Sequence, residues 1–174
     1  MSLFKVLILD VDGVMTDGKF YYSNKGKIMK VFGADDNDAL SLLRKYIKII
    51  FVTGDKKGFS ISKKRICSDM GFELNLVSTI KRIDWIKNKY NAKEVIYMGD
   101  GIFDHYVMKE VGYSIATCGS DNNAKKFADY ITKRNGSERA VAEACLHIMR
   151  KFFKPFNPNK PIQNKTKFSG NWGT

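Results

Sequence analysis

The sequence contains few cysteines, histidines and prolines, the residues whose number and spacing often indicate a disulfide-rich, metal-binding or proline-rich protein. It contains three cysteines, two histidines and three prolines in 174 residues. The cysteines, Cys67, Cys118 and Cys145, are odd in number, far apart and without metal-ligand spacing, which supports neither a disulfide framework nor a zinc site. We therefore expect buried, reduced thiols and a cytoplasmic protein. Neither histidine has a partner pattern, so neither is assigned a catalytic role.

Long apolar runs are also missing. No stretch approaches the roughly 20 residues that a membrane-spanning helix needs. The first five residues lead directly into an apolar segment, so we expect no signal peptide. A length of 174 residues fits one domain, and 44% hydrophobic with 28% charged residues is ordinary for a globular protein.

Acidic residues are scarce relative to basic ones. Lys and Arg number 30 against 18 Asp and Glu, which gives a net charge of +12. Such a charge is found in proteins that bind nucleic acid, anionic membrane surfaces or anionic small substrates. The lysines are scattered and no nucleic-acid-binding motif accompanies them, so we expect no nucleic acid partner and no membrane.

What the chain does contain is an alternation of strand and helix patterns. The predicted strands are residues 6–9, 48–54, 94–101, 113–116 and 130–132. The predicted helices are residues 38–46, 59–70, 80–90, 104–111, 124–128 and 137–153. This order predicts an α/β fold, a doubly wound, mainly parallel, Rossmann-like sheet with helices on both faces.

Two segments interrupt the alternation. Residues 19–32 hold two short apolar runs around a Gly-containing turn, which predicts a β-hairpin inserted after the first strand. Residues 154–174 hold all three prolines and many Asn and Lys residues, which is typical of an extended or disordered tail, although it ends with Phe168 and Trp172. We therefore predict one domain over residues 1–153, followed by a tail.

Two carboxylates, Asp10 and Asp12, leave the first predicted strand together. Side chains alternate along a strand, so both start on the same face, at the carboxyl edge where α/β sheets bind ligands. This arrangement suits a divalent cation, or a nucleophile beside a proton donor. The same residues would also form an ordinary Asx-Gly turn, and only the other strand ends separate these interpretations.

Further polar residues follow the other strands in the same way. Thr53 and Gly54 end the second strand, Lys81 opens a helix, and Asp100 ends a later strand with Asp104 one helical turn beyond it. Phosphoryl transfer through an aspartyl phosphate needs this inventory: a nucleophilic carboxylate, an acid for the leaving group, and cations for the phosphoryl oxygens. The sequence therefore predicts this chemistry.

The arrangement resembles the haloacid dehalogenase superfamily of phosphatases, whose four motifs are matched over residues 7–104. The resemblance implies that Asp10 is the nucleophile and Asp12 the general acid and base. It implies phosphate contacts from Thr53, Gly54 and Lys81, with Asp12 also touching the substrate. It further implies Mg²⁺ held by Asp10, the Asp12 backbone carbonyl and Asp100, with Asp104 in a supporting role.

The motif Asp-Val-Asp-Gly-Val-Met-Thr-Asp-Gly, followed by a hairpin, is more closely similar to the small capless branch of that superfamily. This branch includes the 3-deoxy-D-manno-octulosonate 8-phosphate phosphatases, the phosphatases of nonulosonate phosphates, and the C-terminal domain of some acylneuraminate cytidylyltransferases. The likeness implies a phosphorylated sugar substrate. It also implies a homotetramer in which hairpins of neighbouring subunits cover the active sites.

Three features depart from the branch. Asp55 stands where enzymes acting on the octulosonate phosphate usually have arginine, and it would repel a substrate carboxylate unless Lys63, Lys64 or a neighbouring subunit compensates. Lys64 is accordingly a candidate substrate contact. The segment from residue 55 to residue 71 is longer than expected, and the fourth motif reads Gly-Asp-Gly instead of Gly-Asp-Asp.

Other functions remain as alternatives. One is a phosphatase of another small phosphomonoester, and a second is a catalytically silent oligomerising or regulatory module. A third, a response-regulator-like receiver, needs its phosphorylated aspartate on a later strand and does not fit the hairpin. The intact set of acids at the strand ends favours the enzyme, because a silent domain has no physical need to keep like charges together.

Overall fold

A computed structural model of the protein describes residues 3–160. Its centre is a six-stranded sheet in the order β5-β4-β1-β6-β7-β8, and every strand pair in it is parallel. The fold class predicted from the sequence is confirmed. The strands are β1 (Val6–Asp10), β4 (Lys48–Thr53), β5 (Glu73–Leu76), β6 (Val95–Gly99), β7 (Tyr113–Ala116) and β8 (Tyr130–Ile131).

β1 lies at the middle of the sheet and is buried on both faces. The chain builds the sheet outward from β1 through β4 to β5, then returns to β6 on the other side of β1 and continues through β7 to β8. The strand order therefore reverses next to β1, and ligands of α/β proteins bind at the carboxyl ends of the strands at such a point.

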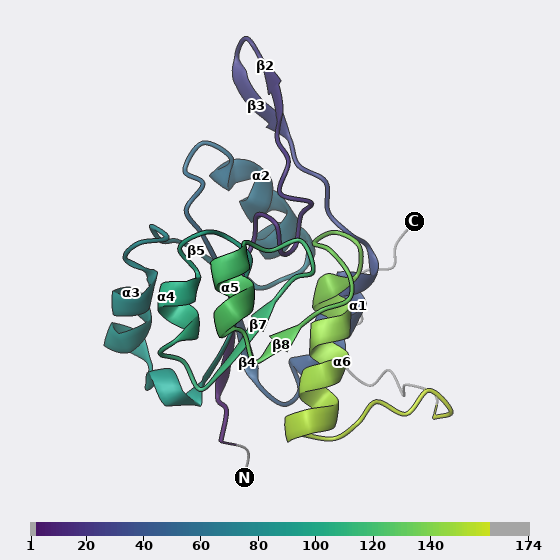
Figure 1. Ribbon diagram of the computed structural model, residues 1–174. Helices are drawn as coiled ribbons and strands as arrows, with labels where there is room; N and C mark the ends of the chain where they lie inside the picture. The colour runs from purple at the N-terminus through teal and green to yellow at the C-terminus, as the bar shows by residue number, and fades with distance from the viewer. Residues whose placement is uncertain (1–2, 161–174) are drawn as a thin grey trace.

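Side-chain alternation in β1 divides the core into two layers. Leu7 and Leu9 belong to one apolar cluster, which includes buried residues of α1 (Asp35–Leu43) and α6 (Ala140–Phe152). Val6 and Ile8 belong to the other, with buried residues of α3 (Arg82–Lys89), α4 (His105–Met108) and α5 (Asn122–Phe127). Figure 1 shows α3 and α4 together at one side of the molecule and α1 with α6 at the other.

The predicted hairpin is present. Strands β2 (Tyr21–Ser23) and β3 (Gly26–Met29) pair antiparallel, and a bridge between Thr16 and Phe32 closes the base of the excursion. Figure 1 shows this hairpin projecting well away from the body of the molecule, at the end opposite the N-terminus. A two-stranded hairpin is marginally stable alone, so its base must be held by contacts with the body.

The predicted helix over residues 59–70 is two elements. An α-helix, α2 (Phe59–Lys63), passes into a π-helix, η1 (Lys64–Asp69). The wider turn of a π-helix accommodates extra residues, which fits the length of this segment. The prediction also missed strand β5, because only four residues of mixed exposure form this edge strand. A short 3₁₀ turn, η2 (Ala92–Glu94), precedes β6.

The last helix is joined to the rest by a buried acid. The side chain of Asp36, in the first turn of α1, accepts a hydrogen bond of 2.8 Å from the backbone N–H of Ala142 in α6. It satisfies a donor that the α6 N-terminus would otherwise leave unpaired. The loop that precedes α6 packs tightly on the loop that follows β1: a Cβ atom at Gly136 would lie 2.3 Å from the carbonyl oxygen of Gly13.

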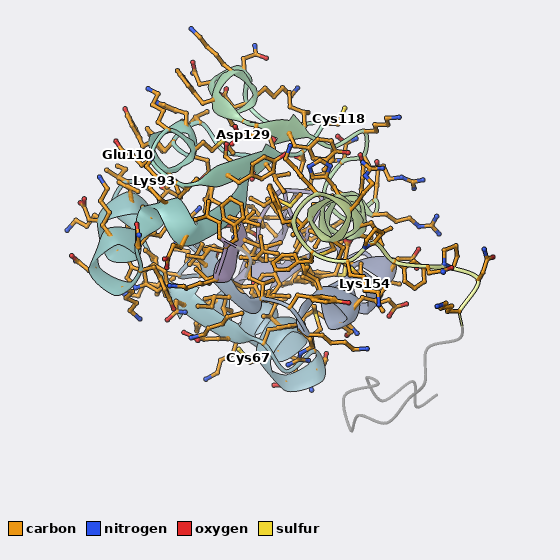
Figure 2. All side chains as sticks on the ribbon, turned by 90° about the horizontal axis from the view of Figure 1, so that it is seen from below. Cys67, Lys93, Glu110, Cys118, Asp129 and Lys154 are labelled. Atoms are coloured by element: carbon orange, nitrogen blue, oxygen red, sulfur yellow. The ribbon has the colours of Figure 1, made fainter. Side chains whose placement is uncertain are left out.

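The three cysteines are unpaired, but the expectation that all are buried is wrong. Cys145 is buried on the apolar face of α6, whereas Cys67 is partly exposed and Cys118 is exposed. Figure 2 shows Cys67 and Cys118 on opposite sides of the molecule. Among residues 3–160 no helix has the length and apolar character required to cross a bilayer. Phe168 and Trp172, the aromatic residues of the predicted tail, lie outside the described residues.

Candidate active site

The polar residues selected from the sequence meet at the carboxyl edge of the sheet. Asp10 is the last residue of β1, Thr53 the last of β4, and Asp100 directly follows β6. These three strands are neighbours, so their ends lie side by side below the hairpin (Figure 1). Gly54 follows Thr53 and is exposed, whereas Asp104 is buried.

Asp10 is paired with a buried arginine. Arg82, the first residue of α3, has no exposed side-chain surface, and its Nη1 lies 2.7 Å from Asp10 Oδ2 and 3.0 Å from Asp104 Oδ1. The same nitrogen lies 2.6 Å from the hydroxyl of Tyr97, which donates to Asp104 at 2.5 Å. Asp10 follows Val6 and Ile8 in the strand alternation, so its side chain points to the α3 layer, where Arg82 lies.

The sequence analysis did not identify Arg82 and instead proposed the adjacent Lys81 as the cation of the site. Lys81 is exposed at the N-cap of α3, and its side chain has no hydrogen bond or ion pair within residues 3–160. A contact between Lys81 and a substrate phosphate therefore stays a prediction. A usable signal was present: Arg82 lies four residues before the buried Ile86, on the apolar face of the helix, where a cation needs a buried partner.

Three carboxylates converge beside this arginine. Asp10, Asp100 and Asp104 each offer an oxygen, and these oxygens lie within 4.8 Å of one another. Burial, followed by the charges of Asp10 and Asp104, raises the pKa of Asp100 to about 8. Burial is also the main cause that raises the pKa of Asp10 to about 6, against the opposing charge of Arg82. Three carboxyl groups beside one guanidinium leave an excess of acidic groups, which a further cation would neutralise.

A glycine packs directly against this cluster. Gly13 has a φ of +82°, and a Cβ atom there would lie 1.9 Å from Asp100 Oδ2, so only glycine fits over this carboxylate. Hard divalent cations such as Mg²⁺ take carboxylate and carbonyl oxygens as ligands. The donor set of Asp10 and Asp100, with Asp104 beside them, therefore fits such an ion. Asp104 also accepts from the backbone N–H of Asp100 at 2.9 Å, which orients the loop.

Asp12 lies in a different environment from Asp10. Its Oδ2 accepts a hydrogen bond of 3.1 Å from the hydroxyl of Thr53, and its Oδ1 forms an ion pair of 2.6 Å with Lys30 Nζ. The side chain is 19% exposed. Two acids separated by one residue thus have different partners, which is the usual way in which a protein assigns them different roles.

Asp55 is neutralised by the hairpin rather than by the residues the sequence analysis considered. Lys27 and Lys30 both form ion pairs with its Oδ2. Although burial acts in the opposite direction, hydrogen bonds from these two lysines lower the pKa of Asp55 to about 2. Lys64 is exposed and pairs with Asp69 at 3.1 Å. Its contact with substrate stays a prediction.

Comparison with known proteins identifies the family of this chain. A model of the haloacid dehalogenase-like hydrolase family matches residues 19–145. The 3-deoxy-D-manno-octulosonate 8-phosphate phosphatase KdsC of Escherichia coli strain K12 is 32% identical over 147 residues, which cover 81% of this chain and 77% of that protein.

Solved structures show the same fold. The cobalt-bound deoxy-D-mannose-octulosonate 8-phosphate phosphatase (YrbI) of Haemophilus influenzae has a TM-score of 0.74 at 25% identity, over 84% of this chain and 88% of that one. The 3-deoxy-D-manno-octulosonate 8-phosphate phosphatase of Moraxella catarrhalis, in complex with magnesium, phosphate and KDO, has a TM-score of 0.72 at 23% identity. The match covers 86% of this chain and 87% of that one.

The family match covers well over half of the chain. The chain therefore belongs to the haloacid dehalogenase-like hydrolases, as a phosphatase of the branch that contains KdsC and YrbI.

Proposed function

We propose that the protein is a Mg²⁺-dependent phosphatase that hydrolyses the phosphate ester of a 2-keto-3-deoxy sugar acid, an octulosonate 8-phosphate or a nonulosonate 9-phosphate. The observation that carries this proposal is the separation of Asp10 and Asp12. Asp10 lies between Arg82 and two further carboxylates, whereas Asp12 lies between Lys30 and Thr53. The substrate class rests on the relatives named octulosonate 8-phosphate phosphatases.

The first chemical step assigns a role to each acid. A carboxylate oxygen of Asp10 attacks phosphorus, the bond from phosphorus to the sugar oxygen breaks, and Asp12 gives its proton to that oxygen. Arg82 keeps Asp10 ionised and fixes its orientation. Mg²⁺, held by Asp10, Asp100 and the Asp12 backbone carbonyl, would supply positive charge to the phosphoryl oxygens.

The second step regenerates the enzyme. Asp12, now ionised, takes a proton from a water molecule that attacks the phosphoryl group on Asp10, and inorganic phosphate leaves. Thr53, Gly54 and Lys81 are the proposed contacts of the phosphate oxygens, and Lys64 a proposed contact of the sugar. Asp104 supports Arg82 and the Asp100 loop through the contacts described above.

A silent oligomerising module is the weaker alternative. Three buried or half-buried carboxylates within 4.8 Å repel one another and reduce the stability of the fold unless they have a ligand. Phosphatase activity on another small phosphomonoester would keep the same site, and a substrate screen distinguishes it.

The unpaired cysteines support a cytoplasmic location for the enzyme, and we propose no nucleic acid or membrane partner.

We also propose a homotetramer in which hairpins cover neighbouring active sites. The hairpin exposes a set of large apolar side chains, with exposed fractions from 46% to 60%: Tyr21, Tyr22, Ile28 and Met29. Contiguous exposed apolar surface of this kind marks a contact site. The proposed tail, residues 154–174, would contribute to the same cover, and residues 161–174 of it lie outside the described part of the chain.

The nucleophile is tested by Asp10→Asn. An amide cannot attack phosphorus, so activity against a phosphorylated 2-keto-3-deoxy sugar should fall below about one hundredth of the wild-type value. Steady-state release of inorganic phosphate measures it. Asp17→Asn, the same change in the neighbouring turn, is the matched control and should keep activity. An Asp10→Asn protein that turns over at a tenth of the normal rate would sink the assignment.

The choice between the two adjacent cations is tested by Arg82→Lys and Lys81→Met. Arg82 contacts both carboxylate oxygens of Asp10, through Nη1 at 2.7 Å and Nη2 at 3.4 Å. Lysine has a single nitrogen and cannot make both contacts, so Arg82→Lys should lower kcat/KM by about 100-fold or more. Lys81→Met should cost less, about tenfold, because it would remove one proposed contact with a phosphate oxygen and leave the ion pair of Asp10 intact. A larger loss in Lys81→Met than in Arg82→Lys would show that the exposed lysine is the essential cation.

The metal requirement is tested by chelation. Activity should disappear with EDTA and return with Mg²⁺ but not with Ca²⁺, because a compact octahedral oxygen site favours the smaller ion. Asp100→Ala should raise the Mg²⁺ concentration needed for half-maximal activity, and calorimetric titration should show the same loss of affinity. Full activity in EDTA would contradict the metal role of this cluster.

The oligomer is tested at the hairpin. Tyr22→Asp with Ile28→Asp places charge on the exposed apolar strands, so sedimentation velocity should show a monomer in place of a tetramer. Leu146→Asp, on an exposed apolar residue of α6, is the control and should leave the association state unchanged. A wild-type protein that sediments as a monomer and is fully active at nanomolar concentration would refute the proposed assembly.

A further inference from the structure

Lys30 is a buried ammonium group outside the motifs that identify the family. It directly follows strand β3 at the base of the hairpin, and its side chain has no exposed surface. A lysine is rarely fully buried unless its charge is paired and its protons are bonded. The partners of Lys30 therefore show what the position is for.

The ammonium group has three polar neighbours. Nζ lies 2.6 Å from Asp12 Oδ1 and 2.9 Å from Asp55 Oδ2, and it donates to the hydroxyl of Ser62 at 3.0 Å. The side chain of Lys30 has no exposed surface, so it cannot contact a substrate directly. Its effect must therefore pass through a neighbouring residue.

Asp12 is the neighbour that takes part in the proposed reaction. Its Oδ1 is buried, and the ion pair with Lys30 is the one polar contact of that atom in the part of the chain described. The exposed part of the Asp12 side chain therefore excludes Oδ1. Oδ2 accepts a single hydrogen bond, from Thr53, and a carboxylate oxygen has a second lone pair that can carry a proton. Lys30 thus turns Oδ2 toward the site.

Lys30 is itself held in place from the hairpin and from the β4–α2 loop. Asp55 binds both Lys27 and Lys30, and the ring of Phe20 lies 3.2 Å from Lys27 Nζ and 5.4 Å from Lys30 Nζ. Two lysines thus balance the charges of Asp55 and Asp12.

We propose that Lys30 is a positioning residue for Asp12, which fixes one carboxylate oxygen so that the other faces the leaving group, and that the base of the hairpin thereby sets the geometry of proton transfer. The inference rests on the proposed function, in which Asp12 protonates the departing sugar oxygen. It gives the hairpin a role within its own subunit, separate from any contact with a neighbouring copy.

The test compares Lys30→Met with Lys27→Met on two substrates. Lys27 is the matched control, because it lies in the same cluster and binds Asp55 but has no contact with Asp12. The substrates are p-nitrophenyl phosphate, whose leaving group departs without protonation, and a phosphorylated 2-keto-3-deoxy sugar acid, whose alkoxide needs a proton. Purified variants are compared by circular dichroism and urea unfolding before assay.

Lys30→Met should lower kcat for the sugar phosphate by about 100-fold but lower kcat for the aryl phosphate by about tenfold or less, the difference expected for lost general acid catalysis. The KM values should change little, because Lys30 does not reach the substrate. Lys27→Met should leave the ratio of the two kcat values unchanged. Lys30→Arg should restore part of the ratio, since it keeps a charge near Asp12.

A merely structural lysine would lower both kcat values by the same factor, or would lower them in proportion to lost folded protein, and either result overturns the inference. An equal change of the ratio in Lys27→Met would also overturn it, since that lysine does not contact Asp12. Failure of the proposed function is recognised separately: the wild-type protein would then hydrolyse neither substrate with Mg²⁺, whatever residue stands at position 30.

Discussion

The ion pair between Arg82 and Asp10 is the contact on which the site depends. A carboxylate at the end of a fully buried strand loses its hydration, and only a partner of opposite charge with well-placed donors keeps it ionised there. Arg82 supplies that partner from the first turn of α3 and extends it to Asp104 and Tyr97. One guanidinium among three carboxylates still leaves negative charge in excess, which is the electrostatic condition for binding a divalent cation.

The sheet itself creates the difference between the two leading acids. Asp10 is still part of β1, so the strand alternation directs it to the layer of α3. Asp12 lies beyond the strand end, where the chain has turned, and its side chain meets β4 and the hairpin base instead. A spacing of two residues that would place both acids on one face of a continuous strand thus places them in two electrostatic settings.

Much of the fold could be predicted, because the spacing of apolar residues along a strand or helix can be read from the local sequence. Strands β1, β4, β6 and β7 are continuous apolar runs, and their ends located Asp10, Thr53 and Asp100 at one edge. β5 was missed, since a half-exposed edge strand of four residues has little pattern. The π-helix was missed because its hydrogen-bond spacing leaves no composition signal, only an unexpected length.

The cations of the site were harder to predict than its acids. Acids follow strand ends, whose positions are visible in the sequence, whereas the partner lysines come from a hairpin whose seating on the body is a tertiary contact. Lys27 and Lys30 therefore looked like two of many scattered lysines. In the same way Lys81 was preferred to Arg82, because one residue of helix phase decides which side chain points inward.

The central place of β1 has a consequence for how the molecule acquires its site. Val6 pairs with Lys48 on one side and with Val95 on the other, so the strand that carries Asp10 is completed by segments distant in the chain. Pairings of this kind carry the entropic cost of closing long loops, and chains rich in them fold slowly. Asp10, Arg82 and Asp104 come from three distant segments, so the site is complete only when the sheet that joins those segments has formed.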